Sequence, residues 1–410
     1  MQFIYNVIIY LYRLAVIIAS PFNRKAALWC QGRKGFFRKW EDFDAGNRKV
    51  VWFHCASLGE FEQGRPVIEE MKRRDNDLFI LLTFFSPSGY EIRKDYPLAD
   101  AVCYLPDDTP RNSRKFLDVF KPAMALFVKY EFWYNYISAL ERNKIPVYLI
   151  SANFRADQLF FRWYGRWFRK MLHMYSHLFV QSESSQELLR SAGIATVSVS
   201  GDTRFDRVYQ LASSNVEIPL AASFTGSKFT IVAGSTWPAD NSLWIRYMNE
   251  TSHDIKLIIA PHEINEDQVS QLTGSFTVPA ARFSRSDSEN VKGARVLIID
   301  NIGMLSSLYN YGGLAYVGGG FGKGIHNILE ACTHGLPVIF GPNYKKFREA
   351  TELVNLGAAF PIDNYDDFAG RINNLFVNND LLIKAGRIAA DYVKSGTGAS
   401  NIIVDKLLIS

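Results

Sequence analysis

The chain has 410 residues, of which 48% are hydrophobic and 21% are charged, and its formal net charge is +5. This composition excludes a disordered chain, and the length predicts two domains of roughly 150–200 residues each. The four cysteines lie far apart without a C-x-x-C pair, which favours a reducing compartment and argues against a zinc cage. They are Cys30, Cys55, Cys103 and Cys332.

The chain begins with an apolar stretch, and we expect residues 1–22 to form a membrane anchor or an interfacial helix. Residues 3–19 are mostly apolar but are interrupted by Asn6 and Arg13, and about 17 residues is the short limit for a spanning helix. A cleaved signal peptide carries its cations before the apolar stretch; here they follow it, so we exclude one. A spanning signal-anchor and a helix lying on the membrane both remain, and either leaves the body of the chain in the cytoplasm.

Positive charge is concentrated in two segments. One segment follows the apolar N-terminus. The other is FFRWYGRWFRK at residues 160–170, which mixes four cations with six aromatics. Such a run fits a nucleic-acid groove, a surface on anionic lipid headgroups, or a helix whose aromatics pack inward. The apolar N-terminus favours the membrane surface. The first basic segment contains Arg24, Lys25, Arg33, Lys34, Arg38 and Lys39.

Strand patterns alternate with helical stretches in each half of the chain. This alternation predicts two parallel, doubly wound α/β sheets. We expect them to meet near residues 200–207, with the active site in the crevice between them. The predicted strands are 49–54, 78–83, 123–128, 147–151 and 178–181 in the first half, and 229–233, 255–260, 296–299, 314–317 and 337–340 in the second.

Residues 317–340, VGGGFGKGIHNILEACTHGLPVIF, predict a strand, a glycine loop, a helix and a second strand. We expect the helix to start at about Asn327 and to stop at Gly335. Glycines let the backbone approach a ligand, and the free N–H groups of a helix start attract an anion. Glu330 would then accept hydrogen bonds from sugar hydroxyls. The alternative is a loop that only packs the helix on the sheet.

Two common phosphate loops are excluded here. No window reads G-x-G-x-x-G, and Gly322-Lys323 is followed by glycine, so this is not a P-loop. The predicted nucleotide site therefore has neither of the usual phosphate loops.

Other predicted strand ends carry polar residues. Glu60 and Glu131 each follow a strand, although Glu60 could simply be a favourable partner for a helix dipole. In the second half, residues 234–236 follow a strand and are predicted to open a helix, as at anion sites. His173 and His177 have the spacing of a metal pair, but we interpret them as a solvated helix face. Two further strand ends are Pro261-His262 and Ile302-Gly303-Met304.

Together these segments resemble the Kdo (3-deoxy-D-manno-octulosonic acid) transferases of lipid A biosynthesis, from about Trp52 to Gly357. The order and spacing of the pieces make the match specific, whereas no single piece would be. The pieces are HCASLGE (54–60), KYEFW (129–133), SANFR (151–155), GDTRFD (201–206), AGST (233–236), HNILEA (326–331) and GLPVIFGP (335–342).

The resemblance implies a GT-B fold and an inverting glycosyltransferase that uses no metal and no cofactor. It would move Kdo from CMP-Kdo to a lipid A precursor, a tetraacyl-disaccharide bisphosphate, at the cytoplasmic face of the inner membrane. Its partners would include membrane lipid but not nucleic acid. Residues 23–203 would form an acceptor-binding Rossmann-like domain and residues 204–384 a CMP-sugar-binding one. The last helix, 385–410, would pack back on the first domain.

By the same resemblance, Glu60 is the general base, and Glu131 and Arg204 support the transition state. The chain departs from the family pattern in four places. Arg204 replaces a lysine, which keeps the charge but changes the hydrogen-bond geometry, and His262 replaces an arginine, which removes a permanent cation beside the phosphate. Met304 replaces a glutamate, and the family's G-G-H-N-P-L-E reads GIHNILE here. The implied nucleotide-binding residues are Ser235, Thr236, Pro261, His262, Ile302, Gly303, Met304, Asn327, Ile328, Leu329 and Glu330.

Two other functions remain open. One is another GT-B nucleotide-sugar transferase or epimerase with a different donor. The other is a non-catalytic membrane-binding module, which does not explain carboxylates at strand ends.

Overall fold

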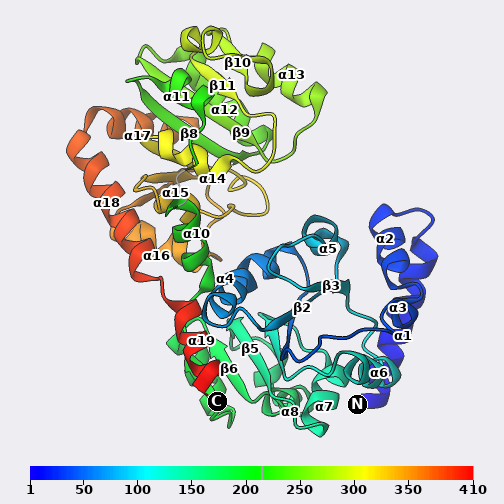
Figure 1. Cartoon of the computed structure of the whole chain (residues 1–410). Coiled ribbons are helices and arrows are strands. Elements are labelled where there is room, and N and C mark those ends of the chain that lie inside the picture. The colour runs from blue at the N-terminus through cyan, green and yellow to red at the C-terminus, as the bar shows by residue number, and fades with distance from the viewer. Residues whose placement is uncertain (214–215, 410) are drawn as a thin grey trace. The chain divides into compact units, whose positions relative to one another are not determined.

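The computed structural model describes residues 1–213 and 216–409, which form two compact units. The first unit contains Met1–Arg207 and Thr397–Ser410, and the second contains Val208–Gly396 (Figure 1). Each unit is built on its own seven-stranded parallel sheet. The prediction of two parallel α/β sheets is therefore confirmed.

The first sheet has the strand order β3-β2-β1-β4-β5-β6-β7. The order reverses between β1 and β4, so the carboxyl ends of these two strands form a topological switch point, where open α/β sheets bind ligands. Strands such as β1 and β2 are buried on both faces, which explains their continuous apolar sequence. The strands are β1 (Val50–Cys55), β2 (Phe79–Phe84), β3 (Ala101–Tyr104), β4 (Met124–Val128), β5 (Val147–Ala152), β6 (His177–Val180) and β7 (Val197–Val199).

Helices cover both faces of this sheet. One face packs against α4 and α19, and the other against α6, α7 and α8. The helices of this unit are α1 (Gln2–Ala19), α2 (Arg24–Arg33), α3 (Phe36–Lys39), α4 (Leu58–Arg74), α5 (Pro87–Arg93), α6 (Pro110–Phe120), α7 (Tyr134–Arg142), η1 (Leu159–Phe161), α8 (Arg166–His173), α9 (Glu183–Ser191) and α19 (Ala399–Ile409). Helix α10 (Thr203–Ser213) begins in this unit.

The second sheet has the order β10-β11-β9-β8-β12-β13-β14. Its order reverses between β8 and β12, which makes their carboxyl ends the corresponding switch point. The strands are β8 (Phe229–Thr236), β9 (Ile255–Pro261), β10 (Ala280–Arg282), β11 (Val296–Ile298), β12 (Leu314–Val317), β13 (Val338–Phe340) and β14 (Ala359–Pro361). The helices are α11 (Pro219–Thr225), α12 (Pro238–Glu250), α13 (Glu266–Gly274), η2 (Phe283–Arg285), η3 (Asn290–Gly293), α14 (Leu305–Leu308), η4 (Tyr309–Tyr311), α15 (Leu329–Cys332), α16 (Arg348–Leu356), α17 (Tyr365–Val377) and α18 (Asn379–Ser395).

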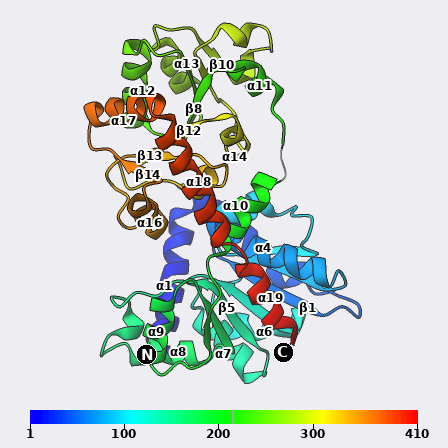
Figure 2. The same cartoon turned by 90° about the vertical axis from the view of Figure 1, so that its left-hand side faces the viewer.

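The predicted C-terminal helix is two helices. The chain breaks at residues 396–398, where Gly398 has φ +105°, a conformation that favours glycine. Asp206 then caps the start of α19, because its carboxylate accepts hydrogen bonds from the backbone N–H groups of Gly398 and Ser400 at 2.5 and 2.7 Å. Helix α19 lies beside α4 in both Figure 1 and Figure 2, and its Ile403 and Val404 are wholly buried in the first unit.

Helix α1 is attached to the first unit by its polar residues. Among the described residues it is the one helix long and apolar enough to cross a membrane, and none of its residues is buried. Large apolar side chains such as Phe3, Ile8 and Leu11 are exposed. Polar contacts that hold the helix to the unit include Tyr5 Oη to Asp108 Oδ2 at 2.5 Å, Asn135 Nδ2 to Asn6 Oδ1 at 2.9 Å, and Arg13 Nε to Asp107 Oδ2 at 3.4 Å.

One prediction, that of a solvated helix face at His173 and His177, is wrong, and the side chain of Arg33 in the basic segment is buried. Arg33 is not a surface cation: its guanidinium lies 3.9 Å from the ring centre of Trp29 and donates to the carbonyl of Leu105 at 2.8 Å. Burial lowers its pKa to about 10. His173 ends α8 whereas His177 begins β6, so the two do not share a helix face. Their spacing arises from a helix–strand connection.

The aromatic-basic run at residues 160–170 is divided between core and surface. Phe160 is buried, and Trp167 and Phe168 pack against the core of the first unit. Trp163 and Tyr164, by contrast, are 90% and 57% exposed. The prediction that the aromatic side chains pack inward therefore describes Phe160, Trp167 and Phe168, whereas the prediction of a surface segment describes Trp163 and Tyr164.

Candidate active site

Glu60 lies in the first turn of α4, directly after β1. Ser57 is the N-cap of this helix, and its hydroxyl donates a hydrogen bond to the Glu60 carboxylate. The helix dipole also favours a negative charge at this position. The side chain is only half-buried, so the carboxylate is both stabilised and within reach of a ligand.

Glu131 follows β4, the neighbour of β1 at the switch point. Its side chain is buried, and its Oε2 accepts a hydrogen bond from the indole N–H of Trp133 at 2.6 Å. Its backbone carbonyl accepts from the Tyr175 hydroxyl at 2.7 Å. The same Oε2 lies 3.3 Å from Nε2 of His54. The carboxylate is therefore held in a defined position.

His54 was not predicted as a site residue, although it begins the HCASLGE piece. It is wholly buried on β1. Its Nδ1 lies 2.8 Å from the Thr83 hydroxyl, which also accepts from the indole of Trp52 at 2.8 Å. The opposite ring nitrogen, Nε2, lies near Glu131 but makes no hydrogen bond to any residue that the structure describes. The buried network thus reaches from the sheet interior to a candidate catalytic carboxylate.

The charges of both carboxylates act on Cys55, the last residue of β1. Burial raises the pKa of the Cys55 thiol well above its ordinary value, and the charges of Glu60 and Glu131 raise it further. Both carboxylates are therefore near the same thiol. The structure thus brings together two residues separated by 71 positions in the sequence (131 minus 60).

Arg204 lies at the start of α10 in the same unit. Its Nε and Nη2 lie 2.8 and 2.7 Å from Asp202 Oδ2. Burial raises the pKa of Tyr130, next to Glu131, and the charges of Arg155 and Arg204 oppose this rise. Both arginines are thus close to the residue preceding Glu131. Arg155 was not predicted as a site residue, although it ends the SANFR piece.

Strand ends in both units contain residues with an unusual backbone conformation. Lys129 after β4, Ser151 in β5 and Ser235 in β8 have φ values of +72°, +54° and +53°. Residues other than glycine seldom adopt these values, and such conformations cluster at functional sites. The observation supports these strand ends as site loops.

The predicted nucleotide-binding residues all lie at the carboxyl edge of the second sheet. Ser235 and Thr236 end β8 and do not open a helix, since α12 begins only at Pro238. Pro261 ends β9, and residues 302–304 form the loop between β11 and α14. Residues 327–330 follow β12 after the glycine loop. The sheet order makes these four segments neighbours.

The helix predicted to begin at Asn327 is much shorter than expected. Helix α15 covers only Leu329–Cys332. Asn327 precedes it, with its side-chain amide donating to Glu330 Oε1 at 3.1 Å and its Oδ1 accepting from the N–H of Leu329 at 3.2 Å. Ile328 and Leu329 are buried, so only their main-chain groups can contact a nucleotide. Glu330 is half-buried and is held by Asn327.

The glycine loop packs main chain against main chain. A Cβ on Gly318 would lie 2.3 Å from the Ser235 carbonyl, and one on Gly320 would lie 2.6 Å from the backbone of Gly341. These positions therefore need glycine because the chain itself occupies the space. For Gly318 and Gly320, the alternative prediction of a loop that only packs against the protein is therefore correct. The contact of Gly318 with Ser235 joins the ends of β12 and β8.

Three aromatic rings stack beside these strand ends. The rings of Trp237 and His262 have centroids 4.7 Å apart, and those of His262 and His326 lie 4.3 Å apart. Trp237 Nε1 also donates to His326 Nε2 at 3.0 Å. Burial, and then the neighbouring His262, lower the pKa of His326. His262 was predicted, but Trp237 and His326 were not.

A pocket of about 320 Å³ opens next to this stack, between α12 and α13. Its volume falls in the range of small-molecule sites. The hydroxyl of Thr236 is buried there without a hydrogen-bond partner among the described residues. The lining residues include Thr236, Trp237, Asn241, Pro261, Glu263 and Gln268.

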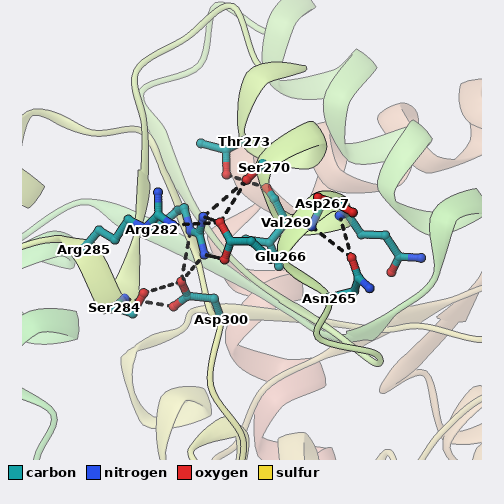
Figure 3. Close-up of polar contacts among 11 residues, drawn as sticks. Asn265, Glu266, Asp267, Val269, Ser270, Thr273, Arg282, Ser284, Arg285 and Asp300 are labelled. Carbon is teal, nitrogen blue, oxygen red and sulfur yellow. Dashed lines mark hydrogen bonds and ion pairs between the residues drawn. The ribbon is translucent and has the colours of Figure 1, made fainter.

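An ion-pair cluster fixes the start of the loop at residues 302–304 (Figure 3). Arg282 Nε donates to Asp300 at 3.0 Å, and its other guanidinium nitrogens bind Glu266 at 2.7 and 2.8 Å. These hydrogen bonds lower the pKa of Glu266 to about 2. Beyond the cluster, Ile302 is 90% exposed and Gly303 has φ +100°. The loop is therefore anchored at Asp300 and exposed at its tip.

Comparisons with known proteins agree with the resemblance predicted from the sequence. Residues 30–207 match the family model described as 3-deoxy-D-manno-octulosonic-acid transferase (kdotransferase). The chain is 29% identical over 335 residues to the 3-deoxy-D-manno-octulosonic acid transferase of Aquifex aeolicus, covering 80% of this chain and 86% of that protein. It is 27% identical over 326 residues to the one of Bordetella pertussis, covering 75% of each.

Solved structures share the fold at low sequence identity. The UDP-GlcNAc 2-epimerase of Neisseria meningitidis bound to UDP-GlcNAc matches with a TM-score of 0.62 at 17% identity, covering 88% of this chain and 100% of that one. MurG of Acinetobacter baumannii matches with a TM-score of 0.56 at 11% identity, with the same coverage. The predicted similarity to Kdo transferases and the GT-B-type fold are therefore confirmed.

Proposed function

We propose that this chain transfers Kdo from CMP-Kdo to a lipid A precursor, a tetraacyl-disaccharide bisphosphate. The observation that carries the proposal is the placement of Glu60 and Glu131 at one topological switch point, inside a segment that matches the Kdo transferase family model. In this proposal the first unit binds the acceptor and the second binds the CMP-sugar.

The proposed reaction is a single inverting displacement. The acceptor hydroxyl attacks the anomeric carbon of Kdo, its proton passes to Glu60, and the bond from that carbon to the phosphate of CMP breaks. CMP leaves with the bonding electron pair. General-base catalysis and correct orientation of the hydroxyl supply the rate enhancement. Glu131 and Arg204 stabilise the charges that develop, and the reaction as proposed uses no metal.

The proposed CMP site is the carboxyl edge of the second sheet. Glu330, held by Asn327, accepts hydrogen bonds from the ribose hydroxyls. The exposed loop at residues 302–304 and the main chain at residues 327–329 approach the nucleotide. The stacked ring of His262 contributes a flat aromatic surface in place of the arginine common in the family, so its contact with CMP is stacking rather than a permanent charge.

The enzyme is proposed to act at the cytoplasmic face of the inner membrane, with α1 lying on the membrane. The polar residues of α1 contact the folded unit through Asp107, Asp108 and Asn135. A spanning orientation would carry these polar contacts into the hydrocarbon, where an ion pair is costly. A helix lying in the interface instead places its exposed apolar residues in the lipid and keeps Arg13 paired.

A direct assay tests the proposal. Purified protein is incubated with CMP-Kdo and the tetraacylated precursor, and the lipid product is analysed by mass spectrometry. We expect a mass gain of one or more Kdo residues. Protein that binds CMP but transfers no Kdo would contradict the proposal.

A second candidate function is that of another GT-B nucleotide-sugar transferase or epimerase. It stays open because a UDP-GlcNAc 2-epimerase shares the fold. Thermal stabilisation by CMP against that by UDP separates the two functions. A larger shift with UDP would favour the second candidate.

A further inference from the structure

An apolar groove lies between α1, α2 and residues 85–87 of the first unit. Its volume is about 380 Å³. The lining combines small residues of α1 with aromatic rings from the rest of the unit, and polar side chains stand beside them. The lining residues are Tyr12, Ala15, Val16, Ala19, Asn23, Lys25, Ala26, Trp29, Phe85, Ser86 and Pro87.

The aromatic part of the groove is held in place from behind. Tyr12, Trp29 and Phe85 contact one another with ring centroids 6.0–6.1 Å apart. The buried Arg33 supports two of these rings, because its guanidinium lies 3.9 Å from the Trp29 ring and donates to the Phe85 carbonyl at 2.9 Å. The groove is therefore preformed.

One polar group in the lining has no partner. Trp29 is 5% exposed, and its indole N–H makes no hydrogen bond to any residue that the structure describes. A buried donor without a partner is costly. The apolar lining itself suits a ligand with apolar length.

The groove continues toward the candidate catalytic carboxylate. The ring of Phe85 lies 4.8 Å from the ring of Trp133, and Trp133 donates to Glu131. A single pair of stacked aromatic residues thus separates the groove from Glu131. Lys25 lines the groove, and together with the exposed basic residues of α2 and α3 it offers positive charge to an anionic headgroup.

We propose that this groove binds an acyl chain of the lipid acceptor. The inference rests on the proposed function and adds the site that recognises the lipid. Docking of one acyl chain beside Glu131 would hold the sugar hydroxyls near the catalytic carboxylates while the remaining chains stay in the membrane.

The groove can be blocked without disturbing a packed core. Ala15 lines the groove but is exposed on α1, so Ala15→Trp adds an indole into the groove. Ile18→Trp is the matched control, because Ile18 lies on the same helix, is 64% exposed and is not part of the lining. Transfer is measured with the tetraacylated precursor and with the same disaccharide bisphosphate after removal of its acyl chains.

We expect Ala15→Trp to raise the KM for the tetraacylated precursor about tenfold, since displaced acyl carbons lose their burial. The KM for the deacylated acceptor, and both KM values of Ile18→Trp, should stay at the wild-type value. Equal KM values of the two variants for the tetraacylated precursor would overturn the proposal that the groove binds an acyl chain.

Photocrosslinking gives a readout that does not need turnover. A tetraacylated precursor carrying a diazirine on one acyl chain is irradiated with the wild-type protein, and labelled peptides are mapped by mass spectrometry. Labels within residues 12–29 and 85–87 support the groove, and labels only elsewhere overturn it. If wild-type protein transfers no Kdo to either acceptor yet is labelled at the groove, the proposed function fails while the lipid site stands.

Discussion

Nε2 of His54 lies 3.3 Å from Oε2 of Glu131, and His54 is completely buried. The opposite ring nitrogen is held by Thr83 at 2.8 Å. The imidazole therefore connects a fixed hydroxyl in the sheet to a carboxylate at the switch point. This arrangement suits a positioning role, in which His54 fixes the orientation of Glu131 without contacting substrate.

His54→Gln tests this role. The glutamine cannot bridge Thr83 and Glu131, so we expect Glu131 to lose its fixed orientation and turnover to fall by about tenfold, which corresponds to about 1.4 kcal/mol. The KM for CMP-Kdo should not change. Steady-state kinetics provide the measurement, with the exposed His173→Gln as control. A fall in thermal stability with unchanged turnover would leave His54 as a structural residue only.

Glu60→Gln should lower turnover by about a hundredfold to ten-thousandfold, because the amide keeps the size of the side chain but cannot accept the proton. CMP affinity should barely change. If Glu60 serves only its helix terminus, the variant loses about 0.3–1 kcal/mol of stability and retains its turnover. Measurement of transfer rate and thermal midpoint on one preparation separates these outcomes, with the exposed Glu187→Gln as control.

Glu330→Ala should weaken CMP binding, because it removes the proposed acceptor for the ribose hydroxyls. A hydrogen bond to a charged group contributes about 1.5–3 kcal/mol, which corresponds to a roughly tenfold to 150-fold weaker Kd. Titration calorimetry with CMP measures the change, and Glu289→Ala, on an exposed surface, is the control. Unchanged affinity in the folded variant would restrict Glu330 to its contact with Asn327.

The first unit should lose stability as the pH falls from about 6.5 to 4. Burial, and then the charge of Lys406, lower the pKa of His177 to about 4, whereas an unfolded histidine titrates near 6.5. Between these values the unfolded chain binds more protons, so protonation favours unfolding. In His177→Gln the thermal midpoint should fall less between pH 7 and pH 5 than in the wild type. Equal falls would show that other groups dominate this pH range.

The orientation of α1 can be determined by labelling. Gln2→Cys should react with a membrane-impermeant maleimide in inside-out vesicles, because a helix lying on the membrane keeps its N-terminus on the same side as the folded body. The wild type gives the background from its own cysteines, of which only Cys30 is partly exposed. Labelling of residue 2 only from the opposite face would establish a spanning helix.

The amino-acid sequence by itself determined the two α/β sheets, because each central parallel strand is buried on both faces and appears as a continuous apolar run. It also placed Glu60 and Glu131 at strand ends, since polar residues follow such runs directly. The four edge strands, β3, β7, β10 and β14, were not predicted, because an edge strand is partly exposed and does not need a continuous apolar run. Helix α15 has only four residues because a turn follows it directly and ends at Gly335, which has φ +70°.

Only the tertiary structure decided which side chains meet. Arg33 belongs to the basic N-terminal segment by sequence, yet it is buried because Trp29 and Phe85 stack around it. His54 contacts Glu131 because β1 and β4 are neighbours in the sheet. The same sheet pairing in the second unit brings Trp237, His262 and His326 into one stack. Such contacts join residues far apart in the chain, and local patterns carry no information about them because packing across the sheet creates them.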